Sequence, residues 1–320
     1  MSSQLCLPPP EVSPFRDGIL KGQVAMVTGG SSGIGYEITR QLGLHGAAVA
    51  IMGRRQNALD DATSALQKDG ITAVSSRGDV RKSEDCARCV EAAQRLGSLT
   101  ILVNCAAGNF LAAADQMSAN AVRTVLEIDT LGTFTASRAA FSALRDSGNG
   151  CIINISATLH YGATWWQAHA SAAKAAVDSL TRSLALEWGA FNIRVNGIAP
   201  GPVAGTAGMA KLDGGTSDKM LSMLPLGRMQ HPWDIAIAAV FLASPAGRCI
   251  SGDTLVVDGA AWIWRPLVVQ RDQVSKVSRG IESKSRSTGL AGLTKGATSG
   301  SAGSATGLAT QTTVRASMLQ

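Results

Sequence analysis

The segment QVAMVTGGSSGIG, residues 23–35, decides the fold. Its first half is an apolar run of the kind found in a strand buried on both faces. Glycines follow, and a helix is expected from about residue 33 to 45. A strand that ends in a glycine-rich turn and opens a helix lets the backbone approach a pyrophosphate, whose charge the helix N-terminus stabilises. The segment therefore predicts a dinucleotide-binding unit; a purely structural glycine-rich turn is the alternative.

The alternation of strand and helix continues along the chain. Further strands are expected at 47–53, 71–79, 99–106, 150–156, 193–200 and 253–260, and further helices near 55–69, 83–96, 118–145 and within 169–189. Nearly continuous apolar strands separated by helices are typical of a parallel sheet covered on both faces. The pattern predicts an α/β fold with a doubly wound, Rossmann-type parallel sheet, which binds ligands at the carboxyl ends of its strands.

The chain is expected to form one domain with flanking segments. Residues 1–20 are proline-rich and predicted to lie on the surface, and residues 21–267 to form the domain. The glycine- and methionine-rich stretch 203–225 interrupts the pattern and is predicted to be a mobile lid. Residues 268–320 are low in large apolar side chains, so a disordered tail is expected there.

The distribution of charge and of cysteines argues against a nucleic-acid-binding domain and against a metal site. From Arg265 onward there are eight basic and two acidic residues, whereas the rest of the chain has 21 of each. The basic character thus belongs to the tail and does not indicate a nucleic-acid-binding domain. Cys86 and Cys89 form a CxxC pair inside a helical pattern without further ligands at matching spacing, so helix packing is expected and no metal site. Neither a membrane span nor a secretory signal is predicted.

The end of the second predicted strand bears on cofactor choice. It reads MGRRQNAL, with Arg54 and Arg55 where NAD-preferring sites carry an acidic residue. A guanidinium binds a 2′-phosphate well, whereas an acidic side chain would repel it. We therefore expect NADP(H); the alternative is that both arginines are ordinary surface charges. Asp79 and Val80, at the end of the third strand, are placed to contact adenine.

Four motifs together resemble the short-chain dehydrogenase/reductase superfamily. They are TGGSSGIG (28–35), NCAAG (104–108), a lysine in the helix at 169–189, and NGIAPGPV (196–203). The resemblance covers about residues 20–264, with the motifs in the family's order and spacing. It implies a Rossmann-type domain, a nicotinamide cofactor and a homotetramer or homodimer.

Two positions depart from the superfamily's usual Asn-Ser-Tyr-Lys set. Ser156 and Lys174 match the serine and the lysine, but Asp129 replaces the asparagine and Ala170 replaces the tyrosine. Only two tyrosines exist in the chain. Tyr36 follows the glycine turn, and Tyr161 lies thirteen residues before the lysine, too far for the usual i, i+4 pairing. Ordinary ketone reduction loses its phenolic acid unless a loop brings Tyr161 close.

One branch of the superfamily also lacks this tyrosine. NCAAGNFL, EIDTLGTF, SATL and HASAAKAAVDSLTRSLALEWG are similar to the peroxisomal 2,4-dienoyl-CoA reductase family. The resemblance implies NADPH-dependent reduction of a 2,4-dienoyl-CoA to a 3-enoyl-CoA, with hydride to the δ-carbon and a proton to the α-carbon. It implies that Asp129, acting with Lys174, holds the water that delivers the proton, while Ser156 orients groups. The alternative for Asp129 is a purely stabilising pair with Lys174.

The resemblance also carries over binding positions. Those expected along the cofactor are Thr28, Gly29, Gly30, Ser31, Ser32, Gly33, Ile34, Gly35, Arg54, Arg55, Asp79, Val80, Asn104, Ala106, Gly108, Lys174, Pro200, Gly201, Pro202, Val203 and Thr206. Those expected along the acyl-CoA substrate are Arg54, Arg81, Phe110, Ser118, Ala119, Asn120 and Lys211. Each of the latter could instead be a solvated charge or a packing side chain. Trp165 and Trp166 are predicted to pack at a helix interface, with stacking on the substrate as the alternative.

The helices at 118–145 and 165–189 are apolar beyond one stripe, which indicates a subunit interface. The family is typically peroxisomal through a C-terminal address, but here Ser317-Met318-Leu319 is followed by Gln320, so the cytoplasm is the alternative. The rival functions are a carbonyl or 3-oxoacyl reductase that uses Tyr161, and an NADP(H)-binding module without turnover.

Overall fold

The computed structural model describes residues 6–206, 221–266 and 273–279. The chain divides into two compact units, Met1–Trp264 and Arg265–Gln320. In the second unit, a short helical segment covers 274–279, within the range where a disordered tail is predicted. The rest of that predicted tail from residue 280 lies outside the described residues.

The first unit is built on one parallel sheet. Its strands are β1 (Val24–Thr28), β2 (Ala48–Gly53), β3 (Ala73–Arg77), β4 (Leu99–Asn104), β5 (Gly150–Ile155), β6 (Ile193–Pro200) and β7 (Thr254–Val257). They lie in the order β3-β2-β1-β4-β5-β6-β7, and every neighbouring pair is parallel. The predicted doubly wound fold is confirmed: β1 to β3 follow one another toward one edge of the sheet, and β4 to β7 follow one another toward the other, so the strand order reverses between β1 and β4.

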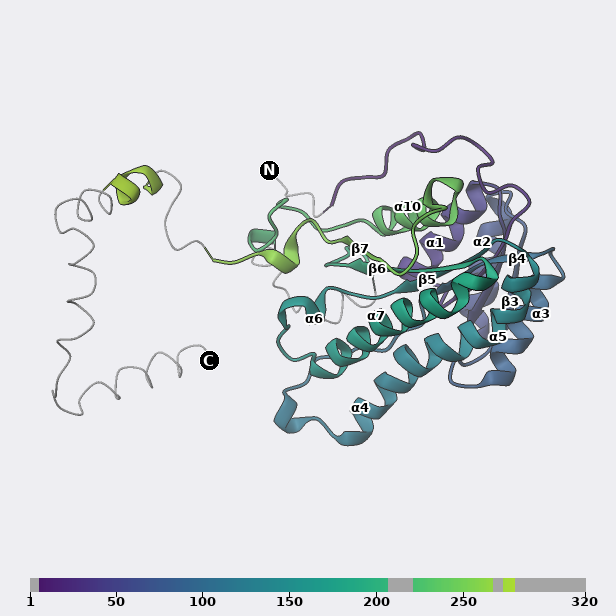
Figure 1. The fold of residues 1–320 in the computed structure, drawn as a ribbon, viewed down its shortest axis with the longest axis horizontal. Coiled ribbons are helices and arrows are strands. Elements are labelled where there is room, and N and C mark those ends of the chain that lie inside the picture. Colours follow the sequence, from purple (N-terminus) through teal and green to yellow (C-terminus); the bar gives the residue numbers. More distant parts are fainter. Residues whose placement is uncertain (1–5, 207–220, 267–272, 280–320) are drawn as a thin grey trace. The chain divides into compact units, whose positions relative to one another are not determined.

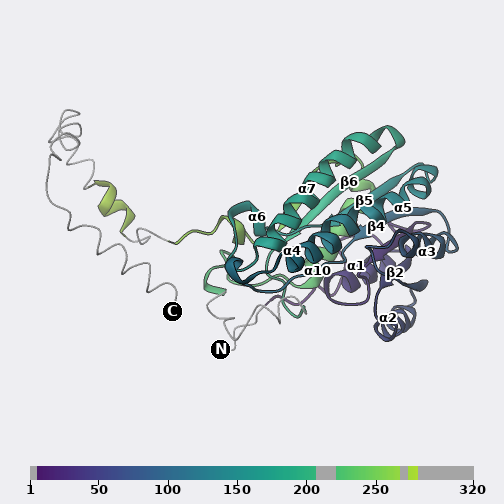
Figure 2. The ribbon, with the colours of Figure 1, turned by 90° about the horizontal axis from the view of Figure 1, so that it is seen from below.

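Helices cover both faces of the sheet. They are α1 (Gly33–Leu44), α2 (Gln56–Lys68), α3 (Ser83–Gln94), α4 (Ala119–Leu126), α5 (Gly132–Asp146), α6 (Leu159–Gly162), α7 (Ala168–Trp188) and α10 (Pro232–Ala243). In Figure 1, α1 and α10 lie above the sheet and α4, α5 and α7 below it. Figure 2, seen from below, has α4 and α7 in front.

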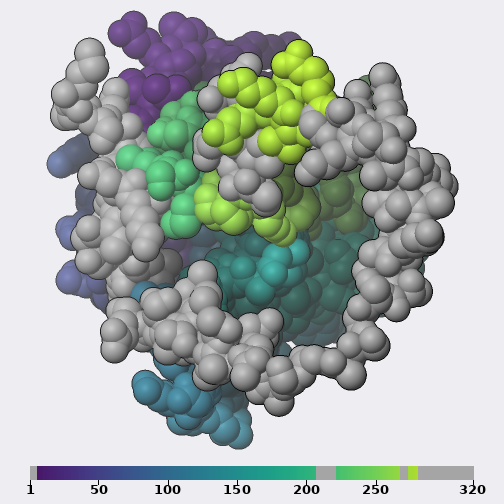
Figure 3. Space-filling view, turned by 90° about the vertical axis from the view of Figure 1, so that its left-hand side faces the viewer, coloured from purple at the N-terminus to yellow at the C-terminus, as the bar shows by residue number. Residues whose placement is uncertain are grey.

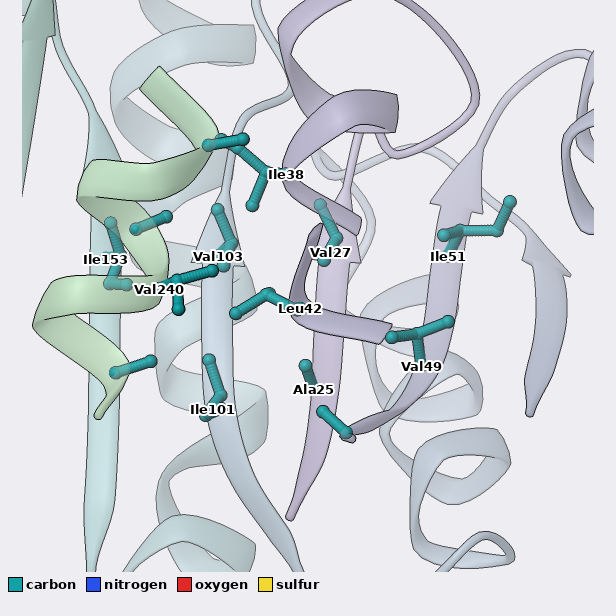
Figure 4. Packing of buried hydrophobic residues seen from close by; sticks show 14 of the residues in the cluster. Ala25, Val27, Ile38, Leu42, Val49, Ile51, Ile101, Val103, Ile153 and Val240 are labelled. Carbon is teal, nitrogen blue, oxygen red and sulfur yellow. The ribbon is translucent and has the colours of Figure 1, made fainter. Parts of the chain in front are cut away.

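Each face of the sheet has its own apolar core. On one face, side chains of α1, α2 and α10 pack on alternate strand residues such as Val27, Val103 and Ile153 (Figure 4). On the other face, α3, α5 and α7 pack on the intervening strand residues. Burial of each large apolar side chain contributes roughly 1.5–3 kcal/mol, so these two layers dominate stability. Cys86 and Cys89 are buried in the second layer, as expected for packing residues.

Two elements differ from the sequence expectation. The helix predicted at 118–145 is interrupted by a π-helical turn, Glu127–Leu131, between α4 and α5. Helix α10 was not predicted. Its signal was present, since Pro232 stands at the first helical position and His231 with Asp234 forms a capping box. Its apolar residues are not confined to one stripe, because α10 packs on the sheet with one side and on α1 with another.

The carboxyl ends of the strands form the edge where a ligand is expected. In doubly wound sheets, ligands bind outside these ends at the point where the strand order reverses. Here that point lies between β1 and β4. Helix α6, which follows β5, lies at this end of the sheet in Figure 1, and Figure 3 looks onto that end.

Candidate functional site

The turn after β1 has a backbone that only glycine fits at two positions. Gly29 has φ +70°, and a Cβ there would lie 3.0 Å from the backbone nitrogen of Ala106. A Cβ on Gly35 would lie 2.3 Å from the carbonyl oxygen of Gly29. The turn is thus folded tightly against its own helix and against the loop after β4. A turn of this kind lets a pyrophosphate approach the backbone closely, which is the role that the sequence predicts for it.

The N-terminus of α1 is suited to an anion. Its first turn has no acidic residue, and Ser32 at the N-cap makes no capping hydrogen bond with its side chain. The positive end of the helix dipole is therefore left for a ligand. Thr28 Oγ1 accepts hydrogen bonds from the backbone nitrogens of Cys105 (3.1 Å) and Ala106 (3.2 Å), which holds the ends of β1 and β4 together.

Basic side chains gather at the ends of β2 and β3. Arg54 and Arg55 are exposed directly after β2. Arg81 pairs with Asp79 at 2.5 Å, and this hydrogen-bonded guanidinium lowers the pKa of the Asp79 carboxyl. The charge of Arg54 acts on Asp79 in the same direction. The pairing neutralises Asp79, so this corner carries net positive charge from the two arginines after β2. Of the remaining predicted positions here, Val80 is buried against Gly132.

Asp129 and Lys174 form a buried ion pair at the centre of the site. Lys174 Nζ lies 3.0 Å from Asp129 Oδ2 and donates a hydrogen bond to the carbonyl oxygen of Ile155 at 2.9 Å. The other carboxylate oxygen of Asp129 accepts a 2.7 Å hydrogen bond from the backbone nitrogen of Gly108. Asp129 is 1% exposed and Lys174 9%. The predicted proximity of these two residues is therefore present in the fold.

The π-helical turn places Asp129. The residue lies in the middle of Glu127–Leu131, and its carbonyl oxygen accepts a 2.6 Å hydrogen bond from Thr133 Oγ1. The next residue, Thr130, donates through Oγ1 to the carbonyl oxygen of Ala173 in α7. The extra residue of a π turn shifts the register of the following helix, and such turns are frequent at functional sites. This turn docks on α7 beside Lys174.

The other members of the catalytic set lie on α7 and after β5. Ser156 is 3% exposed, and its hydroxyl donates to the carbonyl oxygen of Lys174 at 3.5 Å. Ala170 is buried, one turn before Lys174. Tyr161 does not fill the place of a phenolic acid: its hydroxyl donates to Asp178 at 3.3 Å. Burial and the charge of Asp178 raise the pKa of Tyr161 to about 12, the reverse of what an acid at neutral pH needs.

Asn104, predicted to lie along the cofactor, has its side chain in the interior. Its amide donates to Ser137 Oγ and to Asn154 Oδ1, both at 2.9 Å. Asn154 in turn donates to Thr181 of α7. This buried polar chain ties β4 and β5 to α5 and α7, the elements that carry the ion pair. The side chain of Asn104 thus holds the scaffold together, and its backbone is at the end of β4.

The segment after β6 reaches the glycine turn. A Cβ on Gly33 would lie 3.9 Å from Thr206, whose hydroxyl donates to the carbonyl oxygen of Val203. Val203 pairs with Gln230 in an isolated bridge. Pro200, Gly201 and Pro202 lie between β6 and this bridge. Lys211 and most of the predicted lid lie outside the described residues.

The predicted substrate side is formed by the loop after β4 and the start of α4. Ser118 caps α4, its Oγ accepting from the backbone nitrogen of Ala121, so Ser118–Asn120 surround a helix N-terminus. Phe110 is half-buried and stacks on His169. Trp165 and Trp166 are 76% and 45% exposed, so neither is buried between helices of this chain. They follow α6 in a surface turn, where Trp166 has φ +62°.

One residue at the site was missed in the sequence. His169 is 1% exposed, and its ring stacks on Phe110 with centroids 4.1 Å apart. Both ring nitrogens are buried without a hydrogen-bond partner among the described residues. Each unsatisfied buried polar group costs about 1–3 kcal/mol. Burial lowers the pKa of His169, while the charge of Asp129 acts the other way. The signal in the sequence that could have identified His169 is its place directly before Ala170, the position at which the superfamily usually carries its tyrosine.

Among the described residues, no three His, Cys, Asp or Glu side chains gather in a group that could hold a metal ion. No helix in the described part of the chain is both long and apolar enough to cross a membrane.

Known proteins resemble this chain in sequence and in fold. Residues 29–260 match a family model described as enoyl-(acyl carrier protein) reductase. A peroxisomal 2,4-dienoyl-CoA reductase of Arabidopsis thaliana is 54% identical over 86% of this chain and 96% of its own length. One from Mus musculus is 41% identical, covering 79% and 88%. A solved short-chain dehydrogenase from Bacillus anthracis superposes with a TM-score of 0.73 at 35% identity, covering 78% of this chain and all of its own. The chain therefore belongs to the short-chain dehydrogenase/reductase superfamily and, within it, to the family of the 2,4-dienoyl-CoA reductases.

Proposed function

We propose that this protein reduces 2,4-dienoyl-CoA esters to 3-enoyl-CoA esters with NADPH. The observation that carries the proposal is the buried Asp129–Lys174 pair beside Ala170, where other members of the superfamily place a tyrosine. A phenol protonates a ketone oxygen, whereas reduction of a conjugated diene needs a proton at carbon. The identity of the chain to relatives named for this reaction supports the same assignment.

The residues around the glycine turn suit a phosphorylated dinucleotide. Gly29 and Gly35 allow close approach, and the N-terminus of α1 favours the pyrophosphate. Arg54 and Arg55 supply charge for a 2′-phosphate, which supports NADPH over NADH. When bound, this cofactor supplies the hydride that is added to the δ-carbon of the substrate.

The ion pair is assigned two tasks in the reaction. Lys174 keeps its ammonium beside the site through Asp129 and the Ile155 carbonyl, so it hydrogen-bonds the ribose and stabilises the negative dienolate that follows hydride addition. Asp129 retains lone pairs beyond its contacts with Lys174 and Gly108, and with these it orients the water that protonates the α-carbon. Ser156 donates to the Lys174 carbonyl and has an orienting role.

The acyl-CoA is proposed to lie along the loop after β4. Ser118, Ala119 and Asn120 surround the N-terminus of α4, which suits a phosphate or carbonyl oxygen. Arg54 and Arg81 lie at the exposed end of the sheet and suit the CoA phosphates, and Phe110 lies two residues after Gly108, whose nitrogen binds Asp129. Lys211, outside the described residues, is assigned to the same substrate.

The assay that tests the function uses the purified full chain, NADPH and a 2,4-dienoyl-CoA. Loss of NADPH absorbance and of diene absorbance at equal rates is expected, with a 3-enoyl-CoA as product. The Tyr161→Phe variant should retain activity within about threefold, because its hydroxyl bonds Asp178 and not the Asp129–Lys174 pair. Absence of turnover with short and long dienoyl chains would favour a binding module, and loss of activity in Tyr161→Phe would favour a carbonyl or 3-oxoacyl reductase.

Location and assembly follow as proposals from the family. The two reductases of Arabidopsis thaliana and Mus musculus are named peroxisomal, which supports a peroxisomal location. A fluorescent protein carrying this chain's last residues at its C-terminus should enter peroxisomes; a diffuse cytoplasmic signal would contradict the proposal. A homotetramer or homodimer is proposed, with the exposed apolar surface of α4, α5 and the π-helical turn as one interface.

A further inference from the structure

His169 has a polar ring with nothing in the described chain to bind. It is 1% exposed, and both Nδ1 and Nε2 lack a hydrogen-bond partner. Its ring stacks on Phe110, with an interplanar angle of 23°. A phenyl ring would make the same stack without leaving two polar atoms unsatisfied. The stack therefore explains why the residue is aromatic but not why it is an imidazole.

The contacts around His169 place it next to the Asp129–Lys174 pair. On one side, the loop after β4 binds Asp129 through the Gly108 nitrogen and covers His169 through Phe110, two residues further on. On the other side, His169 precedes Lys174 on α7 and lies one turn before Ala173, whose carbonyl oxygen accepts from Thr130. The same loop and the same helix thus hold both residues.

The charge state of His169 suits a hydrogen-bonding role. Burial lowers its pKa, and only the carboxylate of Asp129 acts in the other direction. A neutral imidazole offers one N–H donor and one acceptor, so it can hold a water in a fixed orientation. The neighbouring residue is Ala170, which is 2% exposed and supplies no polar group to the site, whereas a tyrosine would supply a hydroxyl.

We infer that His169 is a positioning residue that holds, together with Asp129, the water that protonates the substrate. The inference rests on the proposed function. In this step an O–H bond of the water breaks and a C–H bond forms at the α-carbon, with the electron pair coming from the dienolate. The hydroxide that remains takes a proton from bulk solvent. The N–H of His169 donates to the water oxygen, and the carboxylate of Asp129 accepts its second hydrogen.

The test compares two substitutions at the same position. His169→Phe keeps the ring and its stack but removes both nitrogens, whereas His169→Gln keeps a donor and an acceptor. The matched control is His45→Phe, which removes another buried imidazole at the C-cap of α1, away from the ion pair. Turnover is measured with 4-deuterated NADPH and, separately, in D₂O, so that hydride transfer and protonation are read independently.

The expected result is a selective defect in protonation. His169→Phe should lower kcat by about 10²-fold with KM little changed, since a positioned proton donor contributes this much. Its solvent isotope effect should rise and its cofactor isotope effect should fall toward one, because protonation becomes slower than hydride transfer. His169→Gln should recover most of the rate, and His45→Phe should leave both isotope effects unchanged.

Two results would overturn the inference. One is a His169→Phe enzyme whose isotope effects equal those of the unmodified protein, which would leave the ring a packing role only. The other is structural and needs no turnover: a high-resolution crystal structure of the unmodified chain in which no water bridges His169 and Asp129. If the unmodified chain turns over no dienoyl-CoA, the proposed function fails, while the crystal structure still decides whether the bridging water exists.

Discussion

At the residue scale, one exchange in α7 changes the chemistry that the site supports. With Ala170 at the position of the usual tyrosine, the site has no phenol there. The lysine of the usual set is present as Lys174, and it pairs with Asp129 in the interior. A buried ion pair seldom adds net stability, because two charges lose their hydration. The buried Asp129–Lys174 pair is better explained by a need for charge and for fixed orientation beside the reacting atoms.

Substitution of either member of the ion pair should abolish most turnover. Asp129→Asn and Lys174→Met are expected to lower kcat by about 10²–10⁴-fold, since each removes a charge placed at the reacting centre. NADPH oxidation with a dienoyl-CoA measures the loss, and circular dichroism checks that the fold persists. Asp146→Asn, which breaks an exposed pair with Arg145, is the control and should keep full activity. Near-complete activity in either site variant would refute the assigned roles.

Charge at the end of β2 should decide between the two nicotinamide cofactors. Arg54→Glu places an acidic side chain where a 2′-phosphate is proposed to bind. Repulsion should weaken NADPH binding, while the carboxylate can accept from the ribose hydroxyls of NADH. The ratio of kcat/KM for NADPH over NADH should fall by about 10²-fold. Arg95→Glu, on the exposed end of α3, is the comparison, and an equal shift there would indicate a general charge effect.

At the scale of elements, two departures from regular structure shape the site. The glycine turn brings β1, α1 and the loop after β4 into backbone contact. The π-helical turn between α4 and α5 carries Asp129 and docks on α7 through Thr130. Regular strands and helices supply the frame, and these two irregular segments supply the cofactor cradle and the carboxylate.

A single added methyl group should disable the glycine turn. In Gly35→Ala the new Cβ would meet the Gly29 carbonyl oxygen at 2.3 Å, so the turn must open. The dissociation constant for NADPH, measured by fluorescence titration, is expected to rise at least about tenfold, which corresponds to about 1.4 kcal/mol. Gly189→Ala, whose Cβ would meet no atom within 4 Å, is the matched control and should bind normally. Equal binding by both variants would show that the close approach is unimportant.

At the scale of the whole molecule, the first unit leaves apolar surface on the helices below the sheet. Leu131 is 48% exposed and Phe134 40%. They border an open groove with Val122, Leu126 and Leu180, contributed by α4, the π-helical turn, α5 and α7. Large apolar side chains gathered on one helical surface are typical of a subunit interface. The surface adjoins the turn that carries Asp129, so assembly and activity should be linked.

A charge placed on this surface should dissociate the proposed homotetramer or homodimer. Phe134→Lys is expected to convert the assembly to smaller species at micromolar concentration, because a buried unpaired ammonium is costly. Light scattering after size-exclusion chromatography gives the mass. Leu44→Lys, at an exposed apolar site on α1, should leave the mass unchanged. A monomeric unmodified chain, or a Phe134→Lys variant of unaltered mass, would contradict an interface here.

The sequence by itself determined the sheet, the glycine turn and the identity of Asp129 and Lys174 as partners. Strand and helix periods and a glycine-rich turn are local signals, and the spacing of family motifs carries over to numbered positions. Only the tertiary structure decided what depends on contacts between distant segments. These include the π-helical turn, the inward amide of Asn104, the pairing of Arg81 with Asp79, and the bond from Tyr161 to Asp178. Only the structure shows that both ring nitrogens of His169 are buried without a hydrogen-bond partner among the described residues. The sequence does not reveal whether a histidine's nitrogens contact water, a protein group or neither.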